Sequence, residues 1–224
     1  MSTIETSGGF RPATIADNLQ EALRASLFTG SFEPGQSISI RKIAEEHGIS
    51  VIPARDALRG LVAEGVLVFK DSRTIAVPVL DTDRIRDIRF ARVALEVELA
   101  RRAFPQLTPE DLSELREIDA QLDNSIERND LDGYVQGNHA FHFYVYDRAQ
   151  SPLMLRMVET LWLQYAPSMR MVCALVGAHG IAHDYHRAAM TALAAGDADG
   201  FTDAIAHDIH QGMDFIAEEV LRPE

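Results

Sequence analysis

The stretch IRKIAEEHGISVIPARDALRGLVAEGVL, residues 40–67, decides the fold of the first part of the chain. Its opening residues place apolar side chains at helical spacing and end at Gly48, a residue that commonly closes a helix. A tight turn follows, with Ser50 as a candidate N-cap, and Pro53 is tolerated in the first turn of the next helix. The apolar residues of that helix form one stripe: Ala54, Ala57, Leu58, Leu61 and Val62. The stretch therefore predicts two helices joined by a tight turn.

The flanking segments complete a small domain. Residues 14–28 carry apolar residues at helical spacing, and a turn with two Gly and one Pro follows over 29–38. The β-rich run VLVF, residues 66–69, begins at the end of the quoted stretch, and the polar turn KDSR joins it to a second β-rich run, TIAVPVL, residues 74–80. The order helix, helix, turn, helix, hairpin is that of a winged helix-turn-helix, which we expect to occupy residues 1–80.

Every long segment after residue 80 has the pattern of a helix. The six predicted helices span about 82–104, 108–128, 131–149, 152–176, 178–195 and 198–220. The expected fold is therefore mostly α, with an N-terminal winged helix-turn-helix and a C-terminal all-α helical bundle over residues 81–224.

Composition favours a cytoplasmic protein without membrane association. No apolar run approaches the ~20 residues of a membrane span, and the N-terminus MSTIETSGGF lacks the pattern of a secretory signal. Cys173 is the only cysteine, so no intrachain disulfide can form. The formal net charge of −13 speaks against nucleic-acid binding, but it divides into −1 for residues 1–80 and −12 for the rest. The first part can therefore carry a local basic face.

The stretch quoted above resembles the GntR family of bacterial transcription regulators. The later patterns RVALE, NHAFH and HRAAMTALAAGD are similar to its FadR-type subfamily, which carries an FCD effector domain, and the helix count resembles the shorter, six-helix VanR-like version of that domain. The resemblance extends from about residue 14 to residue 215. It implies a homodimeric transcription regulator, commonly a repressor, whose C-terminal domain binds an effector.

Three arginines of the helix-turn-helix are candidates for contacting DNA. Arg55 and Arg59 lie four residues apart on one face of the second helix of the motif, and arginine reads guanine through two hydrogen bonds. Arg41 begins the preceding helix, and the resemblance matches Arg41 and Arg55 to DNA-contacting positions of the family. Ser50 and the amides at the helix start could bind a phosphate, and Arg73 at the wing tip could enter the minor groove. Alternatively, the helical arginines are simply solvated.

The chain departs from the family pattern at three positions of this domain. Val51 stands where the family usually has Arg, Ile52 where a small polar residue is common, and Thr74 where the wing often has Gly. The loss of an arginine should change the preferred sequence, and Val51 and Ile52 could contact thymine methyl groups. We expect a dimer to bind a palindromic double-stranded operator.

Four polar residues share the apolar faces of predicted bundle helices: Asn138, His142, His186 and Asp208. Buried polar groups need partners, and a metal ion can supply them. The resemblance implies a metal site of one Asp and three His, which this chain matches at His142 and His186. Asn138 replaces the Asp, and Asp208 falls where the last His is expected. This set suits a divalent transition ion such as Zn, Ni or Mn. A slip of one residue would make His207 the ligand instead.

Four further histidines of the second part are surface or secondary candidates: His139, His179, His183 and His210. For any single histidine, a hydrogen-bonded core or surface role is the alternative to metal binding.

Arg92, in RVALE, matches a family position that faces the effector pocket. An arginine there can clamp a carboxylate, so the expected effector is a small organic acid, and Glu96, four residues later, could hold Arg92 in place. The alternative is a simple surface ion pair. Trp162, Tyr165 and Met169 are expected in the core or in the pocket wall.

Two other functions compete with the effector-gated repressor. A hydrolytic metal centre would need a general base, for which Asp208 or Glu96 could serve, but the chain has no nucleophile motif and no phosphate-binding Gly-rich loop. We therefore expect no enzyme. The other possibility is a regulator whose second domain binds its effector without metal or only dimerises.

Overall fold

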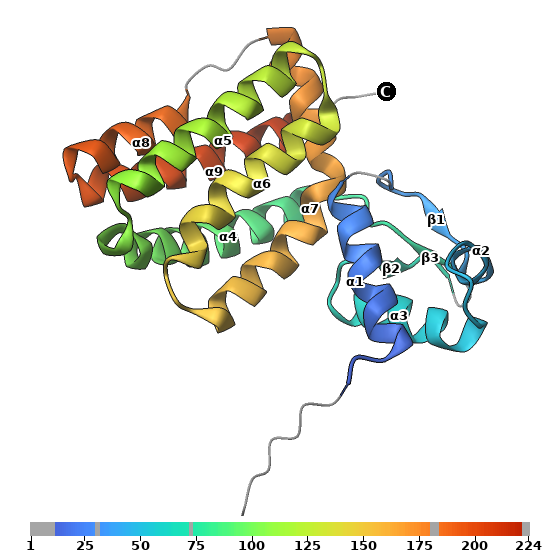
Figure 1. The fold of residues 1–224 in the computed structure, drawn as a ribbon. Coiled ribbons are helices and arrows are strands. Elements are labelled where there is room, and N and C mark those ends of the chain that lie inside the picture. The colour runs from blue at the N-terminus through green and yellow to red at the C-terminus, as the bar shows by residue number, and fades with distance from the viewer. Residues whose placement is uncertain (1–11, 30–31, 72–73, 180–183, 221–224) are drawn as a thin grey trace, which may run out of the picture.

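The structure is a computed structural model that describes residues 12–29, 32–71, 74–179 and 184–220. A small N-terminal part packs beside a larger bundle of helices, with α1 next to the middle of α7 (Figure 1). The N-terminal helices are α1 (Ile15–Phe28), α2 (Ile40–Glu46) and α3 (Val51–Ala63). The strands of the N-terminal part are β1 (Ser37–Ile38), β2 (Val68–Phe69) and β3 (Ile75–Ala76). The expected fold class is confirmed.

Local signals fix the ends of the N-terminal helices. Thr14 and Asp17 form a capping box at the start of α1, in which each side chain accepts a hydrogen bond from the other residue's backbone N–H. Gly48 and Gly65 have φ angles of +63° and +71°, a conformation that favours glycine, and each follows shortly after the end of a helix. The tight turn between α2 and α3 lies where the sequence predicts it.

The wing is a three-stranded antiparallel sheet with the order β1-β3-β2. Ser37 and Val68 both pair with Ala76, so β3 is the central strand. The predicted hairpin is present with shorter strands. The prediction of a plain turn over 29–38 is wrong at its end, because β1 adds a third strand there. A two-residue strand just after Pro34 and Gly35 is too short to show a period in the sequence.

The second part holds six α-helices within the residues that the structure describes, as expected. They are α4 (Thr82–Ala103), α5 (Pro109–Glu127), α6 (Leu131–Asp147), α7 (Pro152–His179), α8 (Tyr185–Ala195) and α9 (Ala198–Val220), with one 3-10 turn at Phe104–Gln106. The predicted start of the fifth helix, at residue 178, is wrong. The preceding helix continues to His179, and Asp184 caps α8 by accepting a hydrogen bond from the Arg187 N–H. None of the described helices has the length and apolar composition of a membrane span.

The two parts have separate cores joined by specific contacts. Leu163 of α7 packs into the N-terminal core, whereas Leu80 belongs to the core of the bundle. Arg84 of α4 donates hydrogen bonds to the Gly65 carbonyl oxygen at 2.5 Å and to Gln164 Oε1 at 3.0 Å. Gln164 Nε2 in turn donates to the carbonyl oxygen of Glu64 at 3.1 Å. The end of α3 is therefore tied to α4 and α7 of the bundle.

Candidate functional site

Three of the predicted ligands meet inside the bundle. His142 on α6, His186 on α8 and Asp208 on α9 each offer an atom within 4.8 Å of the others. His142 Nε2 lies 2.9 Å from Asp208 Oδ2, and His186 Nε2 lies 3.7 Å from Asp208 Oδ1. The Nε2 atoms of the two imidazoles are 3.4 Å apart. The helical spacing that predicted interior positions for these residues therefore brings three potential metal-ligand atoms close together.

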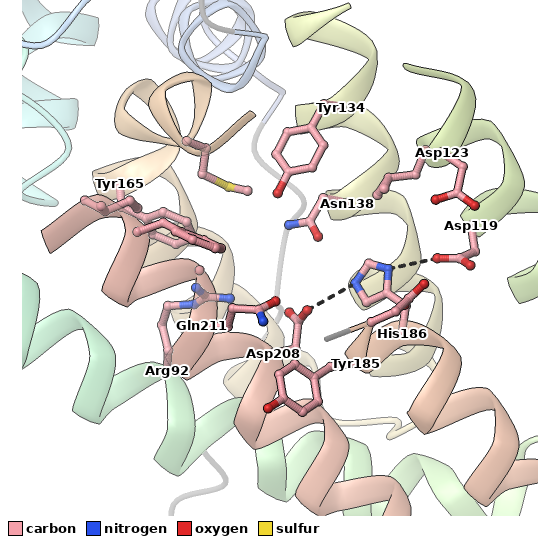
Figure 2. A pocket seen from close by; sticks show the side chains of 16 residues that line it. Arg92, Asp119, Asp123, Tyr134, Asn138, Tyr165, Tyr185, His186, Asp208 and Gln211 are labelled. Atoms are coloured by element: carbon pink, nitrogen blue, oxygen red, sulfur yellow. Dashed lines mark hydrogen bonds and ion pairs between the residues drawn. The ribbon is translucent and has the colours of Figure 1, made fainter. Parts of the chain in front are cut away.

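The other nitrogen of each imidazole, Nδ1, also has a hydrogen-bond partner. His186 Nδ1 lies 3.2 Å from Asp119 Oδ1 on α5, as Figure 2 shows, and His142 Nδ1 lies 3.0 Å from the Tyr146 hydroxyl. Sequence reasoning missed both partners. Asp119 shares the buried stripe of α5 with Leu115 and Leu122, so its helical spacing was a usable signal.

The surroundings of the site stabilise the charged form of the Asp208 carboxylate and shift the pKa values of the two imidazoles in opposite directions. Burial alone would raise the pKa of Asp208, but the adjacent His186 and the hydrogen bond with His142 lower it to about 2. Burial, together with the neighbouring His186, lowers the pKa of His142, although Asp208 acts in the opposite direction. For His186 burial also acts downward, yet Asp208 and Asp119 together raise the pKa. The site therefore concentrates negative charge around two imidazole nitrogens.

Arg92 is buried and tightly held. Its side chain is 4% exposed, and its Nε and Nη2 donate to the two oxygens of Glu96 at 2.6 and 3.2 Å. Its guanidinium lies 4.8 Å from the ring centre of Trp162 and 4.4 Å from that of Tyr165. Glu96 holds Arg92 inside the protein, so the alternative of a surface ion pair does not apply.

Glu96 does not line the cavity beside Arg92. Its carboxylate is fully buried, and it also accepts hydrogen bonds from the Trp162 indole at 3.1 Å and from the Tyr146 hydroxyl at 2.8 Å. Its expected place as an effector contact is therefore corrected to a place behind Arg92, because intramolecular donors surround both carboxylate oxygens.

A cavity of about 60 Å³ adjoins the histidine site. Its wall includes Arg92, Asn138, Tyr165, Met169, His186 and Asp208 (Figure 2). A water molecule needs roughly 10–15 Å³ by the same measure, so the space suits an ion and a ligand of a few heavy atoms. The buried Tyr165 hydroxyl has no hydrogen-bond partner within the described residues. A ligand in the cavity could satisfy it.

The other histidines take different places. His207 is exposed, its Nδ1 donates to the Asp203 carbonyl oxygen at 2.7 Å and its ring stacks on Tyr185, so the one-residue slip is wrong. His210 is exposed. His139 is half-buried, with its ring centre 4.2 Å from that of Phe28 and 4.0 Å from that of Phe143. His183 and the side chain of His179 lie outside the described residues.

Two of the predicted DNA-contacting residues, Arg41 and Arg55, lie together on one exposed face. Arg41, Val51, Arg55 and Thr74 border a single surface hollow beside β1. Arg59 is exposed on α3, as are two residues at its start: Ser50 and Ile52. Ser50 occupies the N-cap position without using its side chain for capping, so its hydroxyl remains available. Arg73 lies outside the described residues.

A winged helix-turn-helix with outward-facing arginines, followed by a helical bundle with an internal cavity, defines a DNA-binding transcription regulator. Family models agree with this class. Residues 15–77 match the model described as bacterial regulatory proteins of the gntR family, and residues 87–211 match the FCD domain. The FCD match covers more than half of the chain. The chain belongs to the GntR family of transcription regulators and carries an FCD domain, and its relatives are regulators rather than enzymes.

Individual relatives support the assignment. The HTH-type transcriptional regulator McbR of Escherichia coli K12 is 25% identical over 219 residues, which cover 96% of this chain and 99% of McbR. Its solved structure superposes with a TM-score of 0.81 over 92% of this chain and 98% of the other. The HTH-type transcriptional repressor RspR of E. coli K12 is 24% identical over 66% of this chain and 64% of its own length. A putative GntR regulator from Rhodococcus sp. RHA1, 18% identical, shares the fold with a TM-score of 0.72, over 91% of this chain and 97% of the other.

Proposed function

We propose that this regulator is a homodimeric repressor whose operator binding is gated by a small carboxylate bound next to a divalent metal ion. The observation that carries the proposal is the meeting of three potential ligands, His142, His186 and Asp208, beside a cavity that also exposes Arg92. As a protein that acts on chromosomal DNA, it would work in the cytoplasm.

The donor set fits a transition-metal ion. Two imidazole nitrogens 3.4 Å apart cannot form a hydrogen bond unless one of them carries a hydrogen, and Asp208 adds a carboxylate oxygen to the same point. A divalent cation would satisfy all three groups at once. Two imidazoles and a carboxylate suit Zn, Ni or Mn. Asn138, 8% exposed and on the cavity wall, would offer an amide oxygen as a weak fourth ligand.

The charge of the cavity supports a metal-dependent effector site. Four aspartates line it: Asp119, Asp123, Asp184 and Asp208. Among the described lining residues Arg92 is the only arginine or lysine, and Glu96 already balances its charge. Arg187 at the rim pairs with Asp123 and Asp184 and offsets part of the excess. A free carboxylate would still meet net negative charge, which a bound divalent ion would reduce. Arg92 and the Tyr165 hydroxyl would then orient the ligand.

The contacts between the two parts offer a route for gating. Trp162 lies next to the Arg92 guanidinium and donates its indole hydrogen to Glu96. Its ring also lies nearly parallel to Phe28, the last residue of α1, with ring centres 6.1 Å apart. A ligand that moves Arg92 would therefore act on a residue that contacts the DNA-binding part. A change in the relative placement of the two recognition helices would disturb their fit to the half-sites.

The outer face of α4 and α7 supports dimerisation with a second copy of this chain. Phe90, Leu153 and Met157 are 78%, 66% and 48% exposed. Next to them runs an apolar groove whose wall includes Ala91, Leu95, Leu153, Met157 and Leu161. The first turn of α4 carries Asp83 and its last turn carries Arg101 and Arg102. Two α4 helices packed antiparallel would bring these opposite charges together, which favours a second copy as the partner.

Repression is the proposed outcome of DNA binding. RspR, a relative of this chain, is named as a transcriptional repressor. Release of DNA on effector binding would use the contacts that run from Arg92 through Trp162 to Phe28.

Selection of DNA from a random-sequence duplex library tests the proposal. The wild-type protein should enrich an inverted repeat, because a two-fold dimer reads two half-sites. Anisotropy of the labelled duplex is then measured with Zn²⁺ and a panel of small organic acids. At least one acid should weaken binding only when Zn²⁺ is present. Equal affinity under all conditions would overturn gating. Elemental analysis tests the alternative of a regulator that binds its effector without metal. Metal-free protein that still responds to an acid would show that no metal is needed.

A further inference from the structure

Tyr146 lies between the histidine site and the Arg92 site. Its hydroxyl oxygen is 2.8 Å from Glu96 Oε2 and 3.0 Å from His142 Nδ1, and its side chain is 1% exposed. A hydroxyl has one hydrogen to donate. The carboxylate of Glu96 can only accept, so the Tyr146 hydrogen points to Glu96. The Tyr146 oxygen is then the acceptor toward His142, which favours a hydrogen on Nδ1 of that imidazole. The Asp208 carboxylate, 2.9 Å from Nε2, favours a hydrogen on Nε2 instead.

The consequence appears on the other side of the His142 ring. A neutral imidazole with its hydrogen on Nδ1 has a lone pair on Nε2, the atom that faces Asp208 and His186. The His186 ring favours the same tautomer, because the Asp119 carboxylate accepts a hydrogen bond from its Nδ1. A cation between Asp208 and the two Nε2 atoms would displace the hydrogen that Asp208 favours on Nε2. Both rings would then turn Nε2 lone pairs to one point, the state that a metal ligand requires.

We propose that Glu96 and Tyr146 are positioning residues that fix the His142 tautomer for metal binding, and that Glu96 serves the metal and the effector together. Glu96 Oε1 accepts from Arg92 Nε and from the Trp162 indole, while Oε2 accepts from Arg92 Nη2 and Tyr146. One buried carboxylate thus orients the guanidinium that faces the cavity and, through Tyr146, the imidazole that faces the ion. The inference rests on the proposed metal site.

The first test compares two tyrosines of the same helix. Tyr146→Phe removes the hydroxyl between Glu96 and His142, whereas Tyr144→Phe removes one that donates to Asp111, away from the site. Loss of such an outer partner typically weakens metal affinity about 10- to 100-fold. We expect that loss of Zn²⁺ affinity in Tyr146→Phe, measured by competition with a chromogenic chelator, and wild-type affinity in Tyr144→Phe.

The second test reads the tautomer itself in metal-free protein. Long-range proton–nitrogen NMR spectra of ¹⁵N-histidine-labelled protein should show a larger share of the Nδ1–H tautomer of His142 in the wild type than in Tyr146→Phe, because the variant keeps only the Asp208 contact, which favours Nε2–H. Glu96→Gln gives a sharper expectation. Tyr146 is the only partner of Glu96 that can also accept, so the amide nitrogen should face it. Tyr146 would then donate to His142, move the ring hydrogen to Nε2 and weaken Zn²⁺ binding.

The outcomes separate this inference from the proposed function. A wild-type protein that binds no Zn²⁺ contradicts the metal site, and the NMR measurement still tests the tautomer. A wild-type His142 with its hydrogen on Nε2 alone, or a Tyr146→Phe variant that keeps both the wild-type share of the Nδ1–H tautomer and wild-type Zn²⁺ affinity, would overturn the inference. Thermal unfolding of each variant identifies any loss of folding, and Tyr146→Phe retains the buried ring.

Discussion

The Nε2 atoms of His142 and His186 lie 3.4 Å apart, and the Nδ1 atom of each ring is engaged by a separate partner. Two imidazoles in this arrangement turn lone pairs toward the same point unless a hydrogen lies between them. Asp208 brings a carboxylate to that point. The pair therefore forms a place for a positive charge inside an acidic domain, beside the cavity that Arg92 faces.

Arg55→Ala should abolish specific DNA binding while the protein stays folded. Arg55 is exposed at the hollow that it shares with Arg41, so its loss removes base contacts without disturbing the core. An arginine that reads guanine contributes about 1–3 kcal/mol to discrimination. A gel-shift titration with the selected operator measures the effect, and Arg116→Ala on exposed α5 surface is the control. Unchanged operator affinity in Arg55→Ala would contradict the assignment.

Phe90→Glu should convert the dimer into a monomer. The exposed ring lies on the apolar face of α4, and a charge buried without a partner in the interface is unfavourable. Light scattering coupled to gel filtration gives the mass of each species. Val79→Glu alters another exposed apolar residue, 65% accessible and outside this face, and should remain dimeric. A dimeric Phe90→Glu protein would place the interface elsewhere.

Tyr165→Phe should leave the protein as stable as the wild type or more stable by about 1 kcal/mol. Its hydroxyl is buried without a hydrogen-bond partner in the described part of the chain, and burying such a group costs free energy. Urea unfolding of ligand-free protein measures the change. A loss of more than about 2 kcal/mol would mean that the hydroxyl has a stabilising partner. In the presence of metal, the same variant should bind the acid effector more weakly.

Asp111→Asn should destabilise the protein at neutral pH and have less effect in acid. Burial by itself would raise the pKa of Asp111, but the Thr108 N–H, Tyr144 and Arg148 hold it well below its usual range. A lowered folded-state pKa gives stability that is present above the unfolded pKa of about 3.9 and is lost as the pH falls further. We expect a loss of about 1–3 kcal/mol at pH 7 that shrinks toward pH 3. Denaturant unfolding across this range measures it, and a constant difference would show that the charge is not responsible.

Helical spacing predicted much of the site, because His142, His186 and Asp208 each lie on the apolar side of their own helix. The same spacing also carried signals for two partners that were missed, because Tyr146 lies four residues after His142 on α6 and Asp119 lies on the buried stripe of α5. That Asp119 meets His186 depends on how α5 packs against α8. The Arg92–Glu96 pair follows from an i,i+4 spacing, but its burial does not: Trp162 and Tyr165 arrive from another helix to cover it.

The errors in the fold have similarly local causes. Strand β1 is only two residues long and pairs with β3 far along the chain, so no sequence period marks it. The start of α8 was placed too early because Gly177 and Gly180 indicated a break there, whereas the N-cap is Asp184. The helix-turn-helix was predictable because its glycines and its apolar stripe act locally.

Isothermal titration of Zn²⁺ into metal-stripped protein tests the central claim most directly. His142→Ala removes a ligand from the buried cluster, whereas His207→Ala removes an exposed histidine of the neighbouring helix α9. Binding by the wild type and by His207→Ala, with its loss in His142→Ala, is the result that the proposed metal site predicts. Equal Zn²⁺ binding by wild type and His142→Ala, or none by wild type, would contradict it.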